Sequence, residues 1–196
     1  PAARWESFLR FFNSVGFNEI DPIFERDLAF YVFTLPVLGF LRNWLLGMLV
    51  VIGAFTAGFY YLSVNLKGDR FSFEGRFRTH MLVLGALIFV LIAAGHWLGR
   101  YDLLFSKTGA VFGVGYTDHK VLLPALTVLT FVALATGAML LVAAVRSGGY
   151  RLISVGIGLW VVLSLLGTTA LPGLVQRLQV EPSELARERE YLAKNI

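Results

Sequence analysis

Four long apolar stretches dominate this chain and restrict its possible folds more than any other feature. They cover residues 38–64, 79–97, 121–145 and 152–171, and none has Asp, Glu or Lys in its central portion. A helix that crosses a bilayer needs about 20 mostly apolar residues. A helix on the surface of a soluble bundle carries polar residues along its outer side instead. The sequence therefore predicts an all-α protein, an integral membrane bundle of four transmembrane helices.

The composition agrees with this class and excludes others. Of the 196 residues, 57% are apolar and 15% are charged, whereas an ordinary soluble domain has about 25% charged residues. A chain with so many apolar and so few charged residues is not expected to be disordered. The net charge is +4, but the basic residues are dispersed, so we expect no nucleic-acid partner. The chain has no cysteine, which excludes disulfides, thiolate metal sites and thiol nucleophiles.

The charges of the connecting segments predict an orientation. Short loops rich in Lys and Arg lie on the cytoplasmic side of a membrane. The two linkers after the first and third stretches are short and basic, which places them in the cytoplasm and both termini outside. We therefore expect a multi-pass membrane protein. An outward N-terminus without a visible signal sequence further suggests a piece of a longer protein. The basic residues of the two linkers are Lys67, Arg70, Arg76, Arg78, Arg146 and Arg151.

The stretches divide the chain into three regions. Residues 1–37 form an outer interfacial segment, residues 38–171 the transmembrane region, and residues 172–196 an outer charged tail expected to lead to a missing domain. Within residues 5–17, Trp5, Phe8, Leu9 and Phe12 follow the i, i+3, i+4, i+7 spacing of an amphipathic helix. Such a helix lies in the membrane interface or docks on protein, and the sequence leaves both open.

Aromatic side chains are concentrated in the outer interfacial segment. Exposed patches of this kind mark partner surfaces, so we expect contacts with other membrane polypeptides as well as with the lipid bilayer. The alternative is that the rings are buried in the membrane interface of a single chain. The candidate interface residues are Trp5, Phe8, Phe12, Phe30, Tyr31 and Phe33.

Small residues four positions apart occur in three of the apolar stretches. Such pairs allow two helix backbones to approach closely in lipid. We therefore expect helix packing at Gly53 with Ala57, at Gly95 with Gly99, and at Ala133 with Gly137.

His96 is the one candidate for cofactor binding. A neutral imidazole is an axial ligand of haem and other tetrapyrroles, and Gly95 beside it would leave room for a flat ring. His80 lies roughly 24 Å away along a helix, so the two cannot share one metal. The competing interpretation is a histidine that is hydrogen-bonded to a neighbour or to headgroups. Because the sequence has no catalytic triad order, paired carboxylates or metal-ligand spacing, we expect no catalytic residues, no metal and no enzyme.

Four strings together resemble a known family. They are the segment Asp21-Pro-Ile-Phe-x-x-Asp27 with its continuation to Pro36, the segment from His96 to Phe105, the segment Gly115-Tyr-Thr-Asp118 with Leu123-Pro-Ala125, and the segment from Val180 to Ile196. Their order and spacing are similar to those of the uncharacterised bacterial membrane protein family UPF0182. The resemblance implies a long protein with about seven spans and a large extracytoplasmic domain, of which this chain would be the later spans. It implies no mechanism, and His96 and Gly99 depart from the residues usual in the family.

These observations favour a non-enzymatic membrane scaffold or an accessory subunit of a larger membrane complex. Two alternatives stay open. One is a subunit of an electron-transfer or light-harvesting assembly that holds a cofactor or pigment at His96. The other is part of a channel or transporter, although no charged group lies in the middle of a stretch.

Overall fold

A computed structural model describes residues 2–66, 75–107, 112–146, 149–183, 187–189 and 191, with side chains from Trp5 onward. Throughout these residues the regular structure is helical, and four helices are long and apolar enough to cross a membrane: Phe30–Leu66, Gly75–Phe105, Asp118–Val145 and Tyr150–Ser183. The prediction of an all-α membrane bundle is therefore confirmed.

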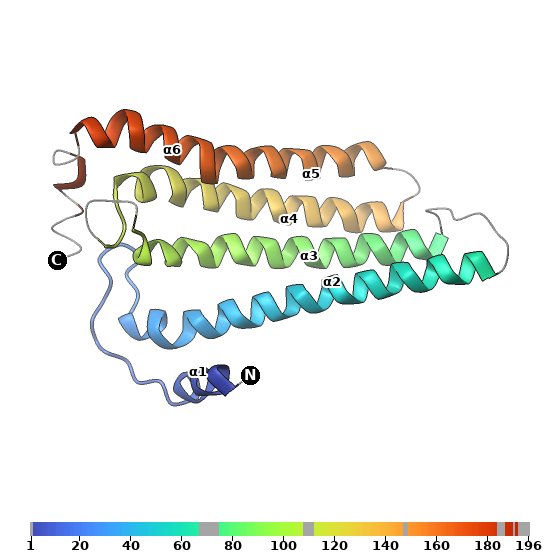
Figure 1. Cartoon of the computed structure of the whole chain (residues 1–196), viewed down its shortest axis with the longest axis horizontal. Coiled ribbons are helices and arrows are strands. Elements are labelled where there is room, and N and C mark those ends of the chain that lie inside the picture. The colour runs from blue at the N-terminus through green and yellow to red at the C-terminus, as the bar shows by residue number, and fades with distance from the viewer. Residues whose placement is uncertain are drawn as a thin grey trace.

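The long helices run alternately up and down (Figure 1). They are α2 (Leu35–Leu66), α3 (Gly75–Asp102), α4 (Leu123–Val145) and α5 (Tyr150–Leu165). The C-terminal ends of α2 and α4 and the N-terminal ends of α3 and α5 lie at one end of the bundle, called the turn end here. The interfacial segment and the described parts of the connection from α3 to α4 and of the C-terminal tail meet at the other, the loop end.

The fourth span continues past Pro172, where the sequence predicts an end or a kink. A π-helical turn, Leu166–Ala170, follows α5 and leads into α6 (Leu171–Val175), which has Pro172 in its first turn. A second π-helical turn and a short 3-10 helix extend the path to Ser183. Proline lacks an N–H and its ring crowds the carbonyl one turn earlier. The carbonyl one turn before Pro172 therefore lacks its usual N–H donor, and the wider π-helical turn lies at this place in the helix.

The core lies between α3 and α4, with α5 covering one side. Ala133 is fully buried, and small side chains let α3 and α4 approach closely. Phe89 packs edge-on against Trp160 of α5, with ring centroids 5.5 Å apart. The buried cluster comprises Leu82, Ala86, Phe89, Ala93, Ala133, Leu140 and Ala143.

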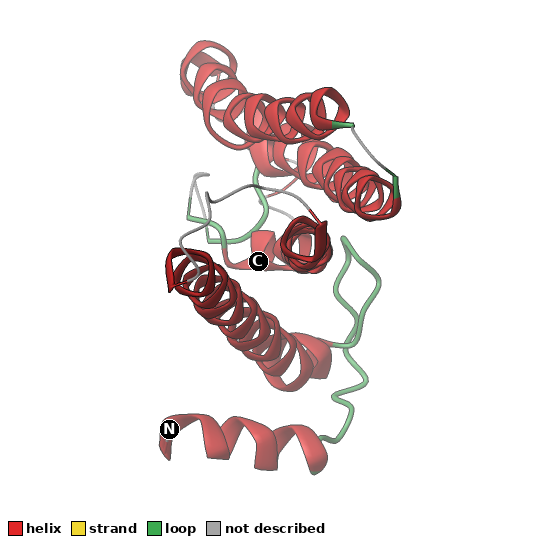
Figure 2. Ribbon diagram, turned by 90° about the vertical axis from the view of Figure 1, so that its right-hand side faces the viewer, coloured by secondary structure: helices red, strands yellow, loops and turns green. Residues whose placement is uncertain are grey.

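Helix α2 packs on α3 at an incline to the other long helices (Figures 1 and 2). Toward the loop end, Arg42 reaches the backbone of α3 at Leu91. Toward the turn end, the Tyr60 hydroxyl lies 3.2 Å from Nδ1 of His80. No residue of the most apolar 18-residue stretch of this span is fully buried, and only one side of the helix, which includes Leu46, Leu49 and Gly53, is half-buried.

Helix α1 (Ala2–Phe12) lies crosswise to the long helices (Figure 2). It contacts α2 through Phe8, whose ring meets that of Phe40 edge-on at 5.7 Å. Its apolar side is otherwise open, with Trp5 67% and Phe12 77% exposed, as expected of a helix in the membrane interface. The amphipathic pattern predicts a helix to residue 17, but the helix ends at Phe12. There Asn13 donates from both its backbone N–H and its side-chain amide to the Leu9 carbonyl.

Candidate functional site

The loop end carries several polar contacts between segments that are distant in the sequence, beginning with a tight turn over residues 20–27. The Asp21 carboxylate is buried and accepts hydrogen bonds from the Phe24 N–H and the Tyr31 hydroxyl. The Asp27 carboxylate accepts three backbone N–H groups, from Phe17, Asn18 and Ala29. These bonds hold the pKa of Asp27 below its ordinary value, and the bond from Ala29 has the largest effect. Both aspartates of the Asp21-to-Asp27 string thus act on the backbone and determine the shape of the turn.

This turn packs on α3 through an aromatic cluster. Tyr31 is 5% exposed and Tyr101 8%, and the rings of Phe24 and Phe30 lie 5.1 Å and 5.0 Å from that of Tyr101. The Arg26 guanidinium lies over the Phe30 ring at 5.2 Å. The interfacial segment is therefore fixed to the bundle by edge-to-face aromatic contacts and a cation–π contact.

The C-terminal tail is attached at the same end, by what we call the tail contact: residues 115–119 with Gln176, Arg187, Glu188 and Tyr191. Glu188 is 1% exposed, and its two carboxylate oxygens accept the Tyr116 N–H at 3.1 Å and 3.3 Å. Arg187 donates to the Tyr116 hydroxyl and lies 5.2 Å over its ring. These bonds join positions more than 70 residues apart in the sequence.

Two more side-chain pairs complete the tail contact. Tyr191 is 4% exposed, and its hydroxyl lies 3.2 Å from Nδ1 of His119. The Thr117 hydroxyl donates to the Gln176 amide oxygen at 2.6 Å. Asp118, which is also buried, accepts the Gly115 N–H. Within the described residues no group of three or more His, Asp or Glu side chains could hold a metal ion. The arrangement therefore fixes chain segments in place.

The candidate ligand His96 bonds to another helix. Its Nε2 accepts a hydrogen bond from the Trp160 indole N–H at 3.2 Å, and the two rings are tilted with centroids 6.1 Å apart. This is the arrangement expected of a histidine bonded to a neighbour. It occupies the ring nitrogen that points away from the backbone, so a tetrapyrrole at this atom would first have to displace Trp160.

The six predicted packing residues fall in different surroundings. At Gly137 an added Cβ would lie 3.3 Å from the Ala86 carbonyl oxygen, so α3 and α4 are in close contact there. At Gly99 the nearest atom is the end of the Leu126 side chain at 3.9 Å, and at Gly53 no atom lies within 4 Å. Ala57 is half-buried on the same helix as Gly53. Two further close contacts were not predicted, because Gly156 and Gly167 have no small residue four positions away that the pattern could pair.

Gly95 faces an arginine of α2. An added Cβ would overlap Nη2 of Arg42, so the guanidinium occupies the space that a side chain would need. The residue at position 95 lies on the same helix face as position 91, one turn earlier, and its missing side chain uncovers the Leu91 carbonyl. Nε of Arg42 donates to that oxygen at 3.0 Å.

The candidate interface aromatics are divided between internal and exposed positions. Trp5 and Phe12 are exposed, whereas Phe8 packs on Phe40 and Phe33 meets Phe17 edge-on at 5.5 Å. Tyr31 lies inside the aromatic cluster, beside the half-buried Phe30. Of the six candidates, Trp5 and Phe12 on α1 are therefore the two whose rings are open to a partner or to lipid.

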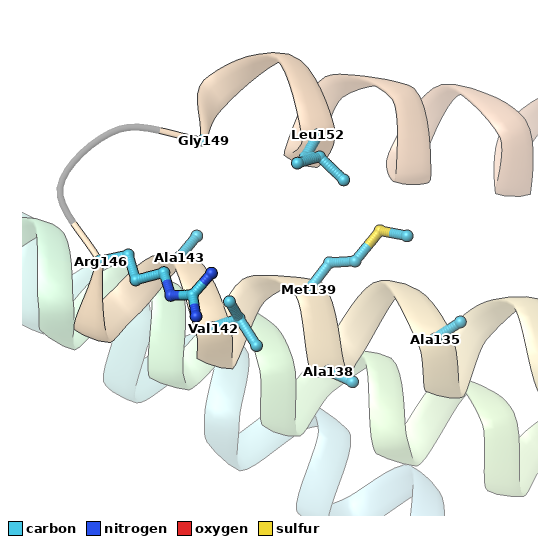
Figure 3. A pocket seen from close by; sticks show the side chains of 8 residues that line it. All are labelled: Ala135, Ala138, Met139, Val142, Ala143, Arg146, Gly149 and Leu152. Atoms are coloured by element: carbon cyan, nitrogen blue, oxygen red, sulfur yellow. The ribbon is translucent and has the colours of Figure 1, made fainter.

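A cavity of about 420 Å³ lies between α4 and α5 near the turn end (Figure 3). Met139 and Leu152 extend into the gap from opposite sides, and Arg146 lies at its end. The remaining lining is mostly alanine and valine. With a single charged group, this cavity can hold hydrocarbon but offers no acid–base pair.

Comparison with known proteins gives a consistent result. The chain matches the family described as "Uncharacterised protein family (UPF0182)" over residues 1–196. A UPF0182 protein of Kineococcus radiotolerans is 38% identical over 199 residues, which cover 99% of this chain and 19% of the relative. UPF0182 proteins of Trichodesmium erythraeum and Moorella thermoacetica are 36% and 38% identical, over 98% and 100% of this chain and 21% and 22% of their own lengths. The chain thus spans about a fifth of the length of these relatives. No solved structure matches it.

Proposed function

Because the chain belongs to the uncharacterised protein family UPF0182, whose curated relatives are about five times as long, we propose that it is a non-enzymatic membrane scaffold. In this proposal the four spans anchor the protein in the bacterial inner membrane. The loop end faces outward and holds extracytoplasmic polypeptide in a defined position, as part of a larger membrane complex.

The tail contact is the observation that carries this proposal. A charged tail that leaves a membrane helix is ordinarily solvated, because burying a carboxylate is costly. Here Glu188 is 1% and Tyr191 4% exposed, and both bond to residues 116–119. The tail is therefore held against the bundle, which is the property that a scaffold for a following segment requires. The orientation rests on the basic linkers at the turn end.

Distance measurement between two spin labels tests the proposal directly. Cysteines introduced at Lys107 and Arg189, both exposed, are the only thiols in the chain. We expect a narrow distance distribution in the labelled protein, and a broad one after Glu188→Ala, which removes the acceptor for the Tyr116 N–H. Glu181→Ala is the matched control, because Glu181 is exposed on the adjoining 3-10 helix. An equally broad distribution in all three proteins would show that the tail is not held, and the scaffold proposal would be abandoned.

A further inference from the structure

An open apolar groove of about 630 Å³ runs along α3 between α2 and α4, in the half of the bundle nearer the loop end. Its volume is within the range of small-molecule sites. Val90, Ala94 and Trp97 of α3 lie along it, with Arg42 on one side and Phe131 on the other. The groove lies between the inclined helix α2 and helix α4, both of which pack on α3.

Arg42 is the charged side chain of this groove, and it has no carboxylate partner among the described residues. A guanidinium has five N–H donors. Those of Arg42 bond to the Leu91 carbonyl and, at 2.7 Å, to the Asn43 side-chain oxygen, so further donors are available to a ligand. Arg100 lies near the same end of the groove, 4.2 Å over the Trp97 ring. Its buried Nε has no hydrogen-bond partner in the described part of the chain. Arg42 and Arg100 thus place two cations at the groove, and none of the described residues that line it is acidic.

Arg42 and Trp97 lie at the depth expected for the boundary between the headgroups and the acyl chains of one leaflet. The crosswise helix α1 meets α2 at Phe40, and Arg42 lies about 3 Å further along α2. Trp97 is 42% exposed, and tryptophan is enriched at headgroup level. From Trp97 the groove continues about 10 Å toward the membrane centre, to Val90. Its charged end is therefore at the level of lipid phosphates and its apolar part at the level of acyl chains.

The geometry points to a binding site for an anionic glycerophospholipid from the leaflet at the loop end. The lipid phosphate accepts hydrogen bonds from Arg42, and an acyl chain fills the groove over Ala94 and Val90. Charge complementarity favours this occupant over another apolar helix, because a helix without an acidic residue would leave Arg42 uncompensated at the edge of hydrocarbon. The inference is independent of the scaffold proposal, since it concerns neither the tail nor the orientation.

Native mass spectrometry of the full chain in detergent tests this site, with phosphatidylglycerol and phosphatidylcholine as probes. We expect the wild-type protein to retain one phosphatidylglycerol and to release phosphatidylcholine. Arg42→Gln should weaken retention about fivefold, because one Lys or Arg near an anionic lipid surface contributes about this factor to the binding affinity. Arg10→Gln is the control for charge, because Arg10 lies on α1 and pairs with Glu6 outside the groove.

Gly95→Ala keeps the charge and tests the geometry. The added Cβ displaces the guanidinium, so retention should fall, whereas Gly47→Ala on α2, with no atom within 4 Å, should leave it unchanged. Circular dichroism establishes that each variant is as helical as the wild type. Equal retention in wild type and Arg42→Gln, or equal retention of the two lipids, would overturn the proposal. A lipid-free dimer would also overturn it, because a second copy of the chain would then occupy the groove.

Discussion

Overpacking the contact between α3 and α4 gives a quantitative test of the bundle. In Gly137→Leu, four carbon atoms would be placed where the Ala86 carbonyl oxygen lies 3.3 Å and the Phe89 Cβ 3.5 Å from the first of them. Both neighbours belong to the backbone or the base of a side chain, so neither can rotate away. The two helices must separate, which loosens the buried cluster around Ala133.

The expected cost follows from the contact geometry and a matched control. Overpacking a filled core costs about 1–3 kcal/mol, but replacing glycine in a helix also recovers about 1 kcal/mol of helix propensity. Gly53→Leu recovers the same propensity at a position with no atom within 4 Å. The difference in unfolding free energy between the two variants should therefore be about 1–3 kcal/mol, which is about a 5- to 150-fold change in the folded-to-unfolded ratio.

Unfolding in mixed micelles with increasing dodecyl sulfate measures this difference. Tryptophan emission is a suitable signal, because Trp160 packs on Phe89 beside the contact. Gly137→Leu should unfold at a lower dodecyl sulfate fraction than Gly53→Leu. If the two variants unfold together, α3 and α4 do not pack at Gly137, and the helix arrangement derived from this contact is wrong.

Contacts elsewhere in the chain support three other predictions. A double-mutant cycle with Trp160→Phe and His96→Phe should give a coupling energy of about 0.6 kcal/mol, a typical value for a hydrogen bond between membrane helices; a coupling of zero in micelle unfolding would exclude the bond. Because the pKa of Asp27 is lowered in the folded chain, its stabilisation is complete above about pH 4 and is lost as the pH falls through the folded pKa. The protection factors of the three amides that bond to it, which are exchange rates corrected for the intrinsic pH dependence, should fall over that range, and Asp27→Asn should abolish this fall. Cysteines placed singly at Leu66 and Lys107 test the orientation: in intact cells an impermeant thiol reagent should label only the second, and the opposite pattern would reverse the topology.

The sequence was sufficient for the fold class because the bilayer imposes a simple rule. Twenty apolar residues without charge form a spanning helix whatever their neighbours, so all four helices could be placed from composition alone. The boundaries were less accurate: the first span begins at Phe30 and the last continues to Ser183. Both extensions carry polar and aromatic residues that are helical because they pack on the loop end, and hydropathy does not measure that packing.

The contacts at the loop end could not be predicted, because they join segments that are far apart in the sequence. Glu188 and Tyr116 are separated by 72 positions, and the charged tail carries no periodicity that indicates burial. The residues next to His96 in the sequence suggest a possible metal or cofactor ligand. They do not indicate that Trp160, on another helix, bonds to it. The pattern of small residues identified Gly95 as a packing position, but the group packed against it is the guanidinium of Arg42.

The bond from Arg42 to α3 has an unusual consequence for how this protein can vary. Its acceptor is the main-chain oxygen at position 91, which every amino acid supplies, so substitutions of Leu91 leave the bond intact. What the bond requires is an arginine at 42 and the lack of any side chain at 95. In relatives, substitutions of Arg42 and of Gly95 should therefore occur together, whereas residue 91 can be substituted without loss of the bond. An analysis of covarying positions would therefore link position 42 on α2 with position 95 on α3, although the residue at position 95 has no side chain.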